Sequence, residues 1–287
     1  MNIIVQTDDC NNKYHFLKNK TYKGKKSKYC MNIVLHREDG PAVEYADGTK
    51  AWYHQGKLHR DGGPAVEYKN GSKFWYKSGL CHNDEGPAAI LCNGTKEWYK
   101  NGELHREDGP AIEHSDGSEE WFLYNKLHRV DGPAFTDSTT KEWFKYGNRH
   151  REDGPAYENS NGTTEWYFLG KIHRENGPAV KHANGDTFWY KDGLLHREDG
   201  PAIEFANGHK EWFKKGKLHR DEGPAIIDNK KKAWYNHGRL HREDGPAIEY
   251  SNGDKEWHLN GLCHRDGGPA IDRNDGRSEW YCKGKRI

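Results

Sequence analysis

The sequence predicts an all-β fold: an elongated antiparallel β-hairpin repeat array, built as a single twisted sheet or solenoid. Three observations support this prediction. A string close to Leu-His-Arg-Glu-Asp-Gly-Pro-Ala recurs eleven times, in steps of 23 residues except for two of 22. All 11 prolines stand five residues after the repeated histidine, and all 11 tryptophans occupy a second fixed position. Residues placed independently would not fall into register, so one repeated unit accounts for nearly the whole chain.

Two marker residues define the repeats, each of which we count from its histidine. The repeated histidines are His36, His59, His82, His105, His128, His150, His173, His196, His219, His241 and His264. The repeated tryptophans are Trp52, Trp75, Trp98, Trp121, Trp143, Trp166, Trp189, Trp212, Trp234, Trp257 and Trp280. We assign residues 1–30 to an N-terminal cap with a Lys-rich segment, and residues 31–287 to eleven repeats of about 23 residues.

Two turns in each repeat predict up-and-down strands. Residues 247–250 have β character, Asn252-Gly253 provides a turn, and residues 254–259 return as a second strand. An Asn-Gly or Asp-Gly pair stands here in nine repeats; the two repeats without it are the 22-residue ones, where the hairpin tip is shortened. A second turn follows the tryptophan and carries glycine in ten repeats, with Asn125 in the other. Two strands per repeat, ~4.8 Å apart, predict a meander on the order of 100 Å long, not a parallel β-helix.

Composition favours a thin core shared between neighbouring repeats. Only 33% of the residues are hydrophobic and the mean hydropathy is −1.19, which is poor for one large central core. The 45 basic and 44 acidic residues nearly cancel, which argues against nucleic-acid or anionic-lipid binding by the array. The one local bias is a lysine cluster. It is compatible with a targeting signal or acidic partner, or with a solvated cap that shields the first sheet edge: Lys18, Lys20, Lys23, Lys25, Lys26 and Lys28.

The position after the tryptophan forms a second aromatic ladder on the opposite face of the strand. It is aromatic in ten repeats: Tyr53, Tyr76, Tyr99, Phe122, Phe144, Tyr167, Tyr190, Phe213, Tyr235 and Tyr281. Burying one tryptophan contributes ~4–6 kcal/mol, so a structural role is expected for the tryptophans. The Tyr/Phe ladder has two compatible roles, as a second structural ladder or as a binding ladder that lines an open groove.

The repeated histidines raise the question of metal or catalytic chemistry. Zn²⁺ requires ligands at ~2.0–2.1 Å, whereas equivalent histidines ~10 Å apart cannot share one ion. We therefore expect the histidines to orient the turn before Gly-Pro, and the arginines to pair with acidic residues of an adjacent rung. No nucleophile elbow, phosphate-binding glycine loop or HExxH motif occurs. The sequence predicts no catalytic residues, no metal, no cofactor and no enzyme activity.

Cysteine use and hydropathy bear on location. None of the six cysteines forms a CxxC pair, and Cys81 and Cys263 replace leucine before the repeated histidine, as small core residues would. Residues 1–10 show no signal peptide, and no apolar run is long enough to span a bilayer. We expect a soluble intracellular protein with reduced thiols, in the cytoplasm, or in the host cytoplasm if the source is viral.

The unit resembles the MORN repeat. Residues 96–105, Lys-Glu-Trp-Tyr-Lys-Asn-Gly-Glu-Leu-His, followed by Asp116-Gly117, match its tryptophan strand and turns. After the histidine the chain has Arg-Glu-Asp-Gly-Pro-Ala in place of the family's Gly-x-Gly step, so it is similar to the divergent MORN-variant repeats of amoeba-infecting giant DNA viruses, also found in bacteria. The resemblance implies β-hairpin arrays that serve as scaffolds, protein-interaction surfaces and dimerisation modules, with phospholipid binding proposed for some members.

Two functional hypotheses follow from the sequence. The first is a non-enzymatic scaffold for protein–protein interaction that also self-associates through its sheet ends. The second is a ligand-binding array for a glycan or phospholipid headgroup, with the Tyr/Phe ladder stacking on the ligand and arginines between the rungs. Protein partners are expected, and neither nucleic acid nor a membrane is.

Overall fold

The computed structural model describes residues 3–18 and 33–287, and within them it confirms an all-β array of short antiparallel hairpins. The described residues contain no helix. The chain divides into two compact units, Met1–Ser138 with Phe144–Gly147, and Thr139–Trp143 with Asn148–Ile287. The lysine cluster beyond Lys18 lies outside the described residues, as does Cys30.

In the first unit, two strands of every repeat join one antiparallel ladder. Its strands, in the order of pairing, are β1 (Ile3–Thr7), β2 (Lys13–Lys18), β4 (Val43–Glu44), β5 (Lys50–Ala51), β8 (Val66–Glu67), β9 (Lys73–Phe74), β12 (Ala89–Ile90), β13 (Lys96–Glu97), β16 (Ile112–Glu113), β17 (Glu119–Glu120) and β20 (Phe135–Thr136). β3 (Ile33–Leu35) also pairs with β2.

The second unit repeats this arrangement with strands in plain chain order. They are β21 (Thr140–Glu142), β24 (Tyr157–Asn159), β25 (Thr164–Glu165), β28 (Val180–Lys181), β29 (Thr187–Phe188), β32 (Ile203–Glu204), β33 (Lys210–Glu211), β36 (Ile226–Ile227), β37 (Lys231–Ala233), β40 (Ile248–Tyr250), β41 (Lys255–Glu256), β44 (Ile271–Asp272) and β45 (Ser278–Glu279). Each strand therefore pairs with the strand before it and the strand after it, as a meander requires.

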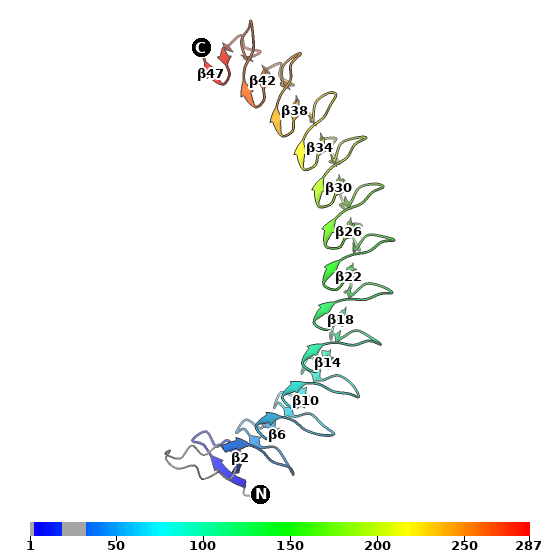
Figure 1. Ribbon diagram of the computed structural model, residues 1–287, viewed down its shortest axis with the longest axis vertical. Helices are drawn as coiled ribbons and strands as arrows, with labels where there is room; N and C mark the ends of the chain where they lie inside the picture. Colours follow the sequence, from blue (N-terminus) through cyan, green and yellow to red (C-terminus); the bar gives the residue numbers. More distant parts are fainter. Residues whose placement is uncertain (1–2, 19–32) are drawn as a thin grey trace, which may run out of the picture. The chain divides into compact units, whose positions relative to one another are not determined.

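Each repeat also forms a small hairpin of its own, outside the ladder. In Figure 1 the hairpins that begin with β6, β10, β14 and β18 follow one another along the first unit, and those from β26 to β42 follow one another along the second. The strands are β6 (Tyr53–His54), β7 (Lys57–Leu58), β10 (Tyr76–Lys77), β11 (Leu80–Cys81), β14 (Tyr99–Lys100), β15 (Glu103–Leu104), β18 (Phe122–Leu123), β19 (Lys126–Leu127), β22 (Phe144–Lys145), β23 (Asn148–Arg149), β26 (Tyr167–Phe168), β27 (Lys171–Ile172), β30 (Tyr190–Lys191), β31 (Leu194–Leu195), β34 (Phe213–Lys214), β35 (Lys217–Leu218), β38 (Tyr235–Asn236), β39 (Arg239–Leu240), β42 (His258–Leu259), β43 (Leu262–Cys263), β46 (Tyr281–Cys282) and β47 (Lys285–Arg286).

The prediction of two strands per repeat is wrong, because the tryptophan divides the second strand. The Trp98 N–H donates to the Ala111 carbonyl of the next repeat at 2.8 Å, and the Trp98 carbonyl accepts from the His105 N–H at 3.0 Å. These bonds take the tryptophan backbone out of the ladder. The residues before it stay in the ladder, in β13, and those after it enter the separate hairpin, in β14. A complete repeat therefore contributes four short strands.

The two turns differ in geometry. At the ladder tip, the Gly253 N–H donates to the Tyr250 carbonyl at 3.0 Å, and Gly253 takes φ +96°, as in a type I turn followed by a glycine bulge. At the small hairpin, both central residues are left-handed, as in a type I′ turn: Asn101 has φ +54° and Gly102 φ +87°. Asn125, with φ +61°, takes the glycine place in its repeat. Asparagine tolerates this region better than most residues, which explains the exception in the sequence.

The core is thin and depends on alanine. The alanine after each repeated proline is 0% exposed. The alanine methyl group fits where the proline loop meets the ladder. The backbone carbonyl of the same alanine accepts a hydrogen bond from the tryptophan N–H. Two apolar clusters add to this core: Val43, Ala51 and Val66 in the first unit, and Ile226, Ala233 and Ile248 in the second.

The described part of the cap continues the ladder. β2 pairs with β4, and the His15 N–H donates to the Ala42 carbonyl at 2.7 Å, as a tryptophan N–H does in later repeats. His15 therefore stands in the place of a tryptophan before the first repeat, and Arg37 Nη1 lies 3.2 Å from its Nε2.

Candidate functional site

The joints between successive repeats bring the tryptophans and arginines together. In nine joints the arginine after the repeated histidine lies over the ring of the preceding tryptophan, with its Cζ 3.8 to 4.1 Å from the ring centroid. The pairs are Trp52–Arg60, Trp98–Arg106, Trp121–Arg129, Trp143–Arg151, Trp166–Arg174, Trp189–Arg197, Trp212–Arg220, Trp234–Arg242 and Trp257–Arg265. Each pair is a cation–π contact worth about 0.5–2 kcal/mol.

Polar contacts hold the guanidinium in place. Arg106 Nη1 donates to the Pro110 carbonyl at 3.1 Å and to Glu113 Oε1 at 2.9 Å. Its Nε donates to Asp108 Oδ1 at 3.0 Å. Arginine thus pairs with acidic residues as the sequence predicted, but they belong to its own repeat, not to an adjacent one. The fold of the His-to-Pro loop brings Asp108 and Glu113 back to the arginine.

The glycine before each proline makes room for this guanidinium. A Cβ on Gly109 would lie 2.5 Å from Arg106 Cζ. At the equivalent glycine of all ten repeats that carry the arginine, a Cβ would lie within 2.5 to 3.3 Å of it. The guanidinium is therefore held between a tryptophan ring and a glycine backbone. We call this arrangement the guanidinium sandwich.

The repeated histidines link neighbouring hairpins. In ten repeats Nδ1 accepts a hydrogen bond from the N–H of the first left-handed residue of the next type I′ turn, at 3.0 to 3.3 Å. Asn101, for example, donates to His82 at 3.1 Å. An accepting Nδ1 places the ring proton on Nε2, which lies 2.9 Å from Asp84 Oδ1. The histidine therefore contacts two turns: the hairpin turn of the next repeat through Nδ1, and the loop before its own Gly-Pro through Nε2.

All ten residues of the Tyr/Phe ladder are partly buried. Tyr53 and Tyr76 pack against the Val43 cluster, and Tyr235 packs against the Ile226 cluster. Burial raises the pKa of each of these hydroxyls. Further along the ladder, Tyr99 and Tyr167 donate their hydroxyls to the glutamates two residues earlier, at 2.9 and 2.8 Å. The ladder is thus part of the core on one side and faces grooves on the other.

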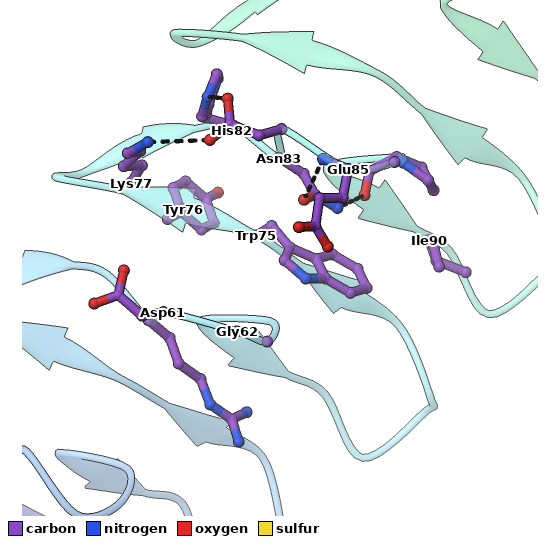
Figure 2. A pocket seen from close by; sticks show the side chains of 14 residues that line it. Asp61, Gly62, Trp75, Tyr76, Lys77, His82, Asn83, Glu85 and Ile90 are labelled. Atoms are coloured by element: carbon purple, nitrogen blue, oxygen red, sulfur yellow. Dashed lines mark hydrogen bonds and ion pairs between the residues drawn. The ribbon is translucent and has the colours of Figure 1, made fainter.

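Shallow grooves lie between successive repeats, and both ladders contribute to them. Three of them have volumes of about 400, 590 and 670 Å³. Each is lined by the loops that follow the repeated histidines of two successive repeats and by the Trp-Tyr pair between them: Trp75-Tyr76, Trp234-Tyr235 and Trp166-Tyr167. Figure 2 shows the first of these grooves. Its walls combine aromatic faces with charged side chains.

Two exposed tyrosines at hairpin tips were missed by the sequence analysis. Tyr124 is 48% exposed and Tyr146 is 54% exposed. Each stacks one face on a repeated histidine, His105 at 4.2 Å and His128 at 4.3 Å between ring centroids. Both are left-handed, with φ +48° and +51°. The sequence does mark these two positions: asparagine, which suits a left-handed turn, stands at the same turn position in Asn101 and Asn260, so a tyrosine there is unusual.

Cys81 is the described thiol whose pKa burial raises most. Burial raises the pKa of Cys81 to about 12, and its Sγ contacts the Ala88 carbonyl at 3.7 Å, so it behaves as a packing residue. Within residues 3–18 and 33–287, His, Cys, Asp and Glu side chains form no group of three suited to a metal ion. That same part of the chain also holds no helix long and apolar enough to cross a membrane.

Comparison of the chain with models of known protein families finds no match, and comparison with curated proteins also finds none.

The guanidinium sandwich predicts that one glycine is far less replaceable than its counterpart. Gly109→Ala places a methyl group against Arg106 and is expected to destabilise the fold by about 1–3 kcal/mol. Gly86→Ala is the matched control. Its repeat has Asn83 in place of arginine, and a Cβ there meets only Asn83 Nδ2, at 3.7 Å. Gly86→Ala is expected to change the free energy of unfolding by no more than about 0.5 kcal/mol. Urea denaturation measures both, and equal losses would contradict the sandwich.

The histidine–turn bond predicts acid sensitivity. Burial, and then the nearby Lys145, lower the pKa of His128, whose Nδ1 accepts from the Tyr146 N–H at 3.3 Å. A folded state that favours neutral imidazole gains stability above the unfolded pKa of about 6.5 and loses it as pH falls through the lower folded pKa. His128→Asn keeps an acceptor oxygen but does not titrate. Its urea midpoint should therefore fall less than that of the parent protein below about pH 6.5; identical pH profiles would contradict this role.

Proposed function

We propose that this protein is a non-enzymatic repeat scaffold that binds other proteins along its hairpins. The observation that carries the proposal is the pair of exposed tyrosines, Tyr124 and Tyr146, at left-handed backbone positions. A bulky L-residue in this region costs roughly 1–2 kcal/mol, whereas asparagine adopts it more easily. Each tyrosine stacks one ring face on a histidine and remains about half exposed. Strain retained at a position that leaves so much of the ring in solvent points to a role outside the fold.

The two tyrosines sit on neighbouring hairpins. The Tyr146 N–H bonds to His128, and the Gly147 N–H donates to the Leu127 carbonyl at 2.8 Å, which ties this turn to the end of β19. Tyr124 is on the turn between β18 and β19, so two tyrosine faces lie on consecutive tips of the first unit. Tyrosine supplies a large, rigid contact area with a polar end, and it is enriched in protein interfaces.

The remaining polar chemistry supports the same proposal. Nine of the repeated arginines are engaged in the sandwiches, and ten of the eleven repeated histidines form the hairpin link. An active site is normally one irregular constellation. The resemblance to MORN-variant repeats also favours a scaffold, and it suggests a giant virus as the source and the host cytoplasm as the location.

The test is capture from cell lysate with the full chain, followed by mass spectrometry. The parent protein is expected to recover a reproducible set of proteins, and the double variant Tyr124→Asn/Tyr146→Asn is expected to lose it. Asparagine is chosen because it suits the left-handed turn. Lys215→Asn, at the same turn position in the second unit, is the matched control and should keep the set.

One result would overturn the scaffold proposal, and another would overturn the assignment of its binding surface. One is no specific capture by the parent protein together with strictly monomeric behaviour in light scattering. The other is full capture by the double tyrosine variant, with an unchanged melting temperature, which would remove the tip tyrosines as the binding surface.

A ligand-binding array is the second candidate, and the grooves favour it. Each groove presents a Trp-Tyr pair beside arginine and acidic side chains, which suits stacking on a sugar ring or contact with a phospholipid headgroup. A glycan array and liposome flotation distinguish this candidate from the scaffold, because negative results in both would eliminate it.

A further inference from the structure

One tryptophan inside the array lacks its arginine. The arginine stands eight residues after the tryptophan in the nine sandwiches, but eight residues after Trp75 the chain has Asn83. The glutamate that pairs with this arginine, such as Glu113 seven residues after Arg106, is replaced as well, by Ile90. Both changes fall in one repeat. The arginine and the glutamate are thus both absent here, while the aromatic ring remains. Loss of the arginine is the distinguishing change, because Thr136, Lys181 and Ile227 replace the glutamate in repeats that keep their arginine.

The space of the missing guanidinium is open. A Cβ on Gly86 would meet only Asn83 Nδ2, at 3.7 Å, whereas the same atom in the arginine-bearing repeats would strike a guanidinium. The Asn83 side chain turns to the loop backbone: its Nδ2 donates to the Pro87 carbonyl at 2.9 Å, and its Oδ1 accepts from the Glu85 N–H at 3.2 Å. Asparagine thus replaces the arginine's bond to the proline carbonyl but does not cover the ring. Trp75, Gly86 and Ile90 all line the resulting groove of about 400 Å³ (Figure 2).

The acidic partner of the missing guanidinium is retained. Glu85 follows Asn83 by two residues, as Asp108 follows Arg106, and in five sandwiches or equivalent sites the acid at this position accepts from arginine Nε. Among the described residues, the Glu85 carboxylate has no hydrogen bond or ion pair. In Figure 2 it extends toward the groove that Trp75 also lines.

The other charged groups of this groove are already paired. Arg60 stacks on Trp52 and pairs with Glu67 at 2.9 Å. Lys77 pairs with Asp84 at 3.0 Å, and Asp84 also lies 2.9 Å from His82. Asp61 lies 3.4 Å from His59. Glu85 is therefore the one lining carboxylate without a partner in the described part of the chain, and it favours a cationic guest.

We propose that Trp75, Gly86 and Glu85 form an arginine socket, which binds the guanidinium of an arginine side chain from a partner protein. Within the protein an arginine stacks on a tryptophan in this way at nine joints, and at four of them the acid two residues after the arginine also accepts from its Nε. These four joints show the geometry that the guest guanidinium would adopt. A planar guanidinium stacks on the indole while donating to a carboxylate, whereas an ammonium group lacks the flat face. The source of the arginine in a partner protein rests on the proposed scaffold function; the guanidinium specificity of the site does not.

The test is an NMR titration of the full chain with three short peptides, acetyl-Gly-Arg-Gly-amide and its citrulline and lysine counterparts. The indole N–H signal of Trp75 is identified by its loss in Trp75→Phe. The arginine peptide is expected to shift this signal saturably with a Kd of roughly 1–10 mM, as suits one cation–π contact and one ion pair. Citrulline has the same shape without charge and should bind at least about tenfold more weakly, because one lost charge-assisted contact of about 1.4 kcal/mol is a factor of ten. The lysine peptide should bind with lower affinity than the arginine peptide.

Matched variants test the assignment in both directions. Asn83→Arg fills the socket from within, so the peptide-induced shift of Trp75 should vanish while the urea midpoint stays or rises. Arg106→Asn/Glu113→Ile copies the natural substitutions at the next joint, and a second saturable shift should then appear at Trp98. Glu85→Gln should weaken the arginine peptide several-fold.

Three outcomes would overturn the socket: no saturable shift of Trp75, equal binding of arginine and citrulline peptides, or undiminished binding by Asn83→Arg. These outcomes are independent of capture from lysate. If the arginine peptide binds at Trp75 but the protein captures no partner from lysate, the scaffold function is contradicted and the arginine socket stands. If the protein captures partners but does not bind the peptide, the socket is contradicted and the scaffold function stands.

Discussion

The contact between one repeat's tryptophan and the next repeat's arginine is the interaction on which the rest of the structure depends. It places a guanidinium between an indole ring and a glycine, and Pro110, Asp108 and Glu113 show how one repeat supplies the remaining partners of Arg106. The requirement explains three positions together. Tryptophan provides the aromatic face, arginine provides the planar charged group that stacks on it, and glycine leaves room for that group because it has no side chain. Each contact is worth about 0.5–2 kcal/mol, and stability in such an array is the sum of many neighbour terms.

Backbone hydrogen bonds also connect successive repeats at the same joint. Each internal tryptophan N–H reaches the buried alanine of the next repeat, which takes the chain out of the shared ladder and into its own hairpin. The histidine that follows then accepts from the next hairpin's turn. A residue such as His82 thus links two hairpins through Asn101, while Trp98 and Arg106 link two repeats. This division of roles leaves the hairpin tips free to vary, and two of them carry exposed tyrosines.

The fold was predictable from the sequence where the determinants are local. The period, the antiparallel meander and both turns follow from glycine, asparagine and proline positions, whose backbone preferences act within a few residues. The division of each strand at tryptophan was not predictable, because the bond to Ala111 joins residues in different repeats. Tyr124 stands out in the sequence itself, because Asn101 and Asn260 hold the same turn position. The role of Glu85, in contrast, could be recognised only once the contacts of the regular repeats were known. A residue that departs from the repeat can be interpreted only when the contacts of the residue that normally occupies its position are known.

A double-mutant cycle between Arg197 and Trp189, whose Cζ-to-ring distance is 4.1 Å, tests the central claim most directly. Arg197→Met keeps the aliphatic stem without the guanidinium, and Trp189→Leu removes the aromatic face. Urea unfolding of the parent, the two single variants and the double variant gives the coupling free energy. The sandwich predicts a favourable coupling of about 1 kcal/mol that persists at high salt, because the contact is held against the ring and partly shielded from solvent. Additive losses, with a coupling near zero, would show that the two side chains stabilise the joint independently, and would contradict the sandwich as the basis of the array.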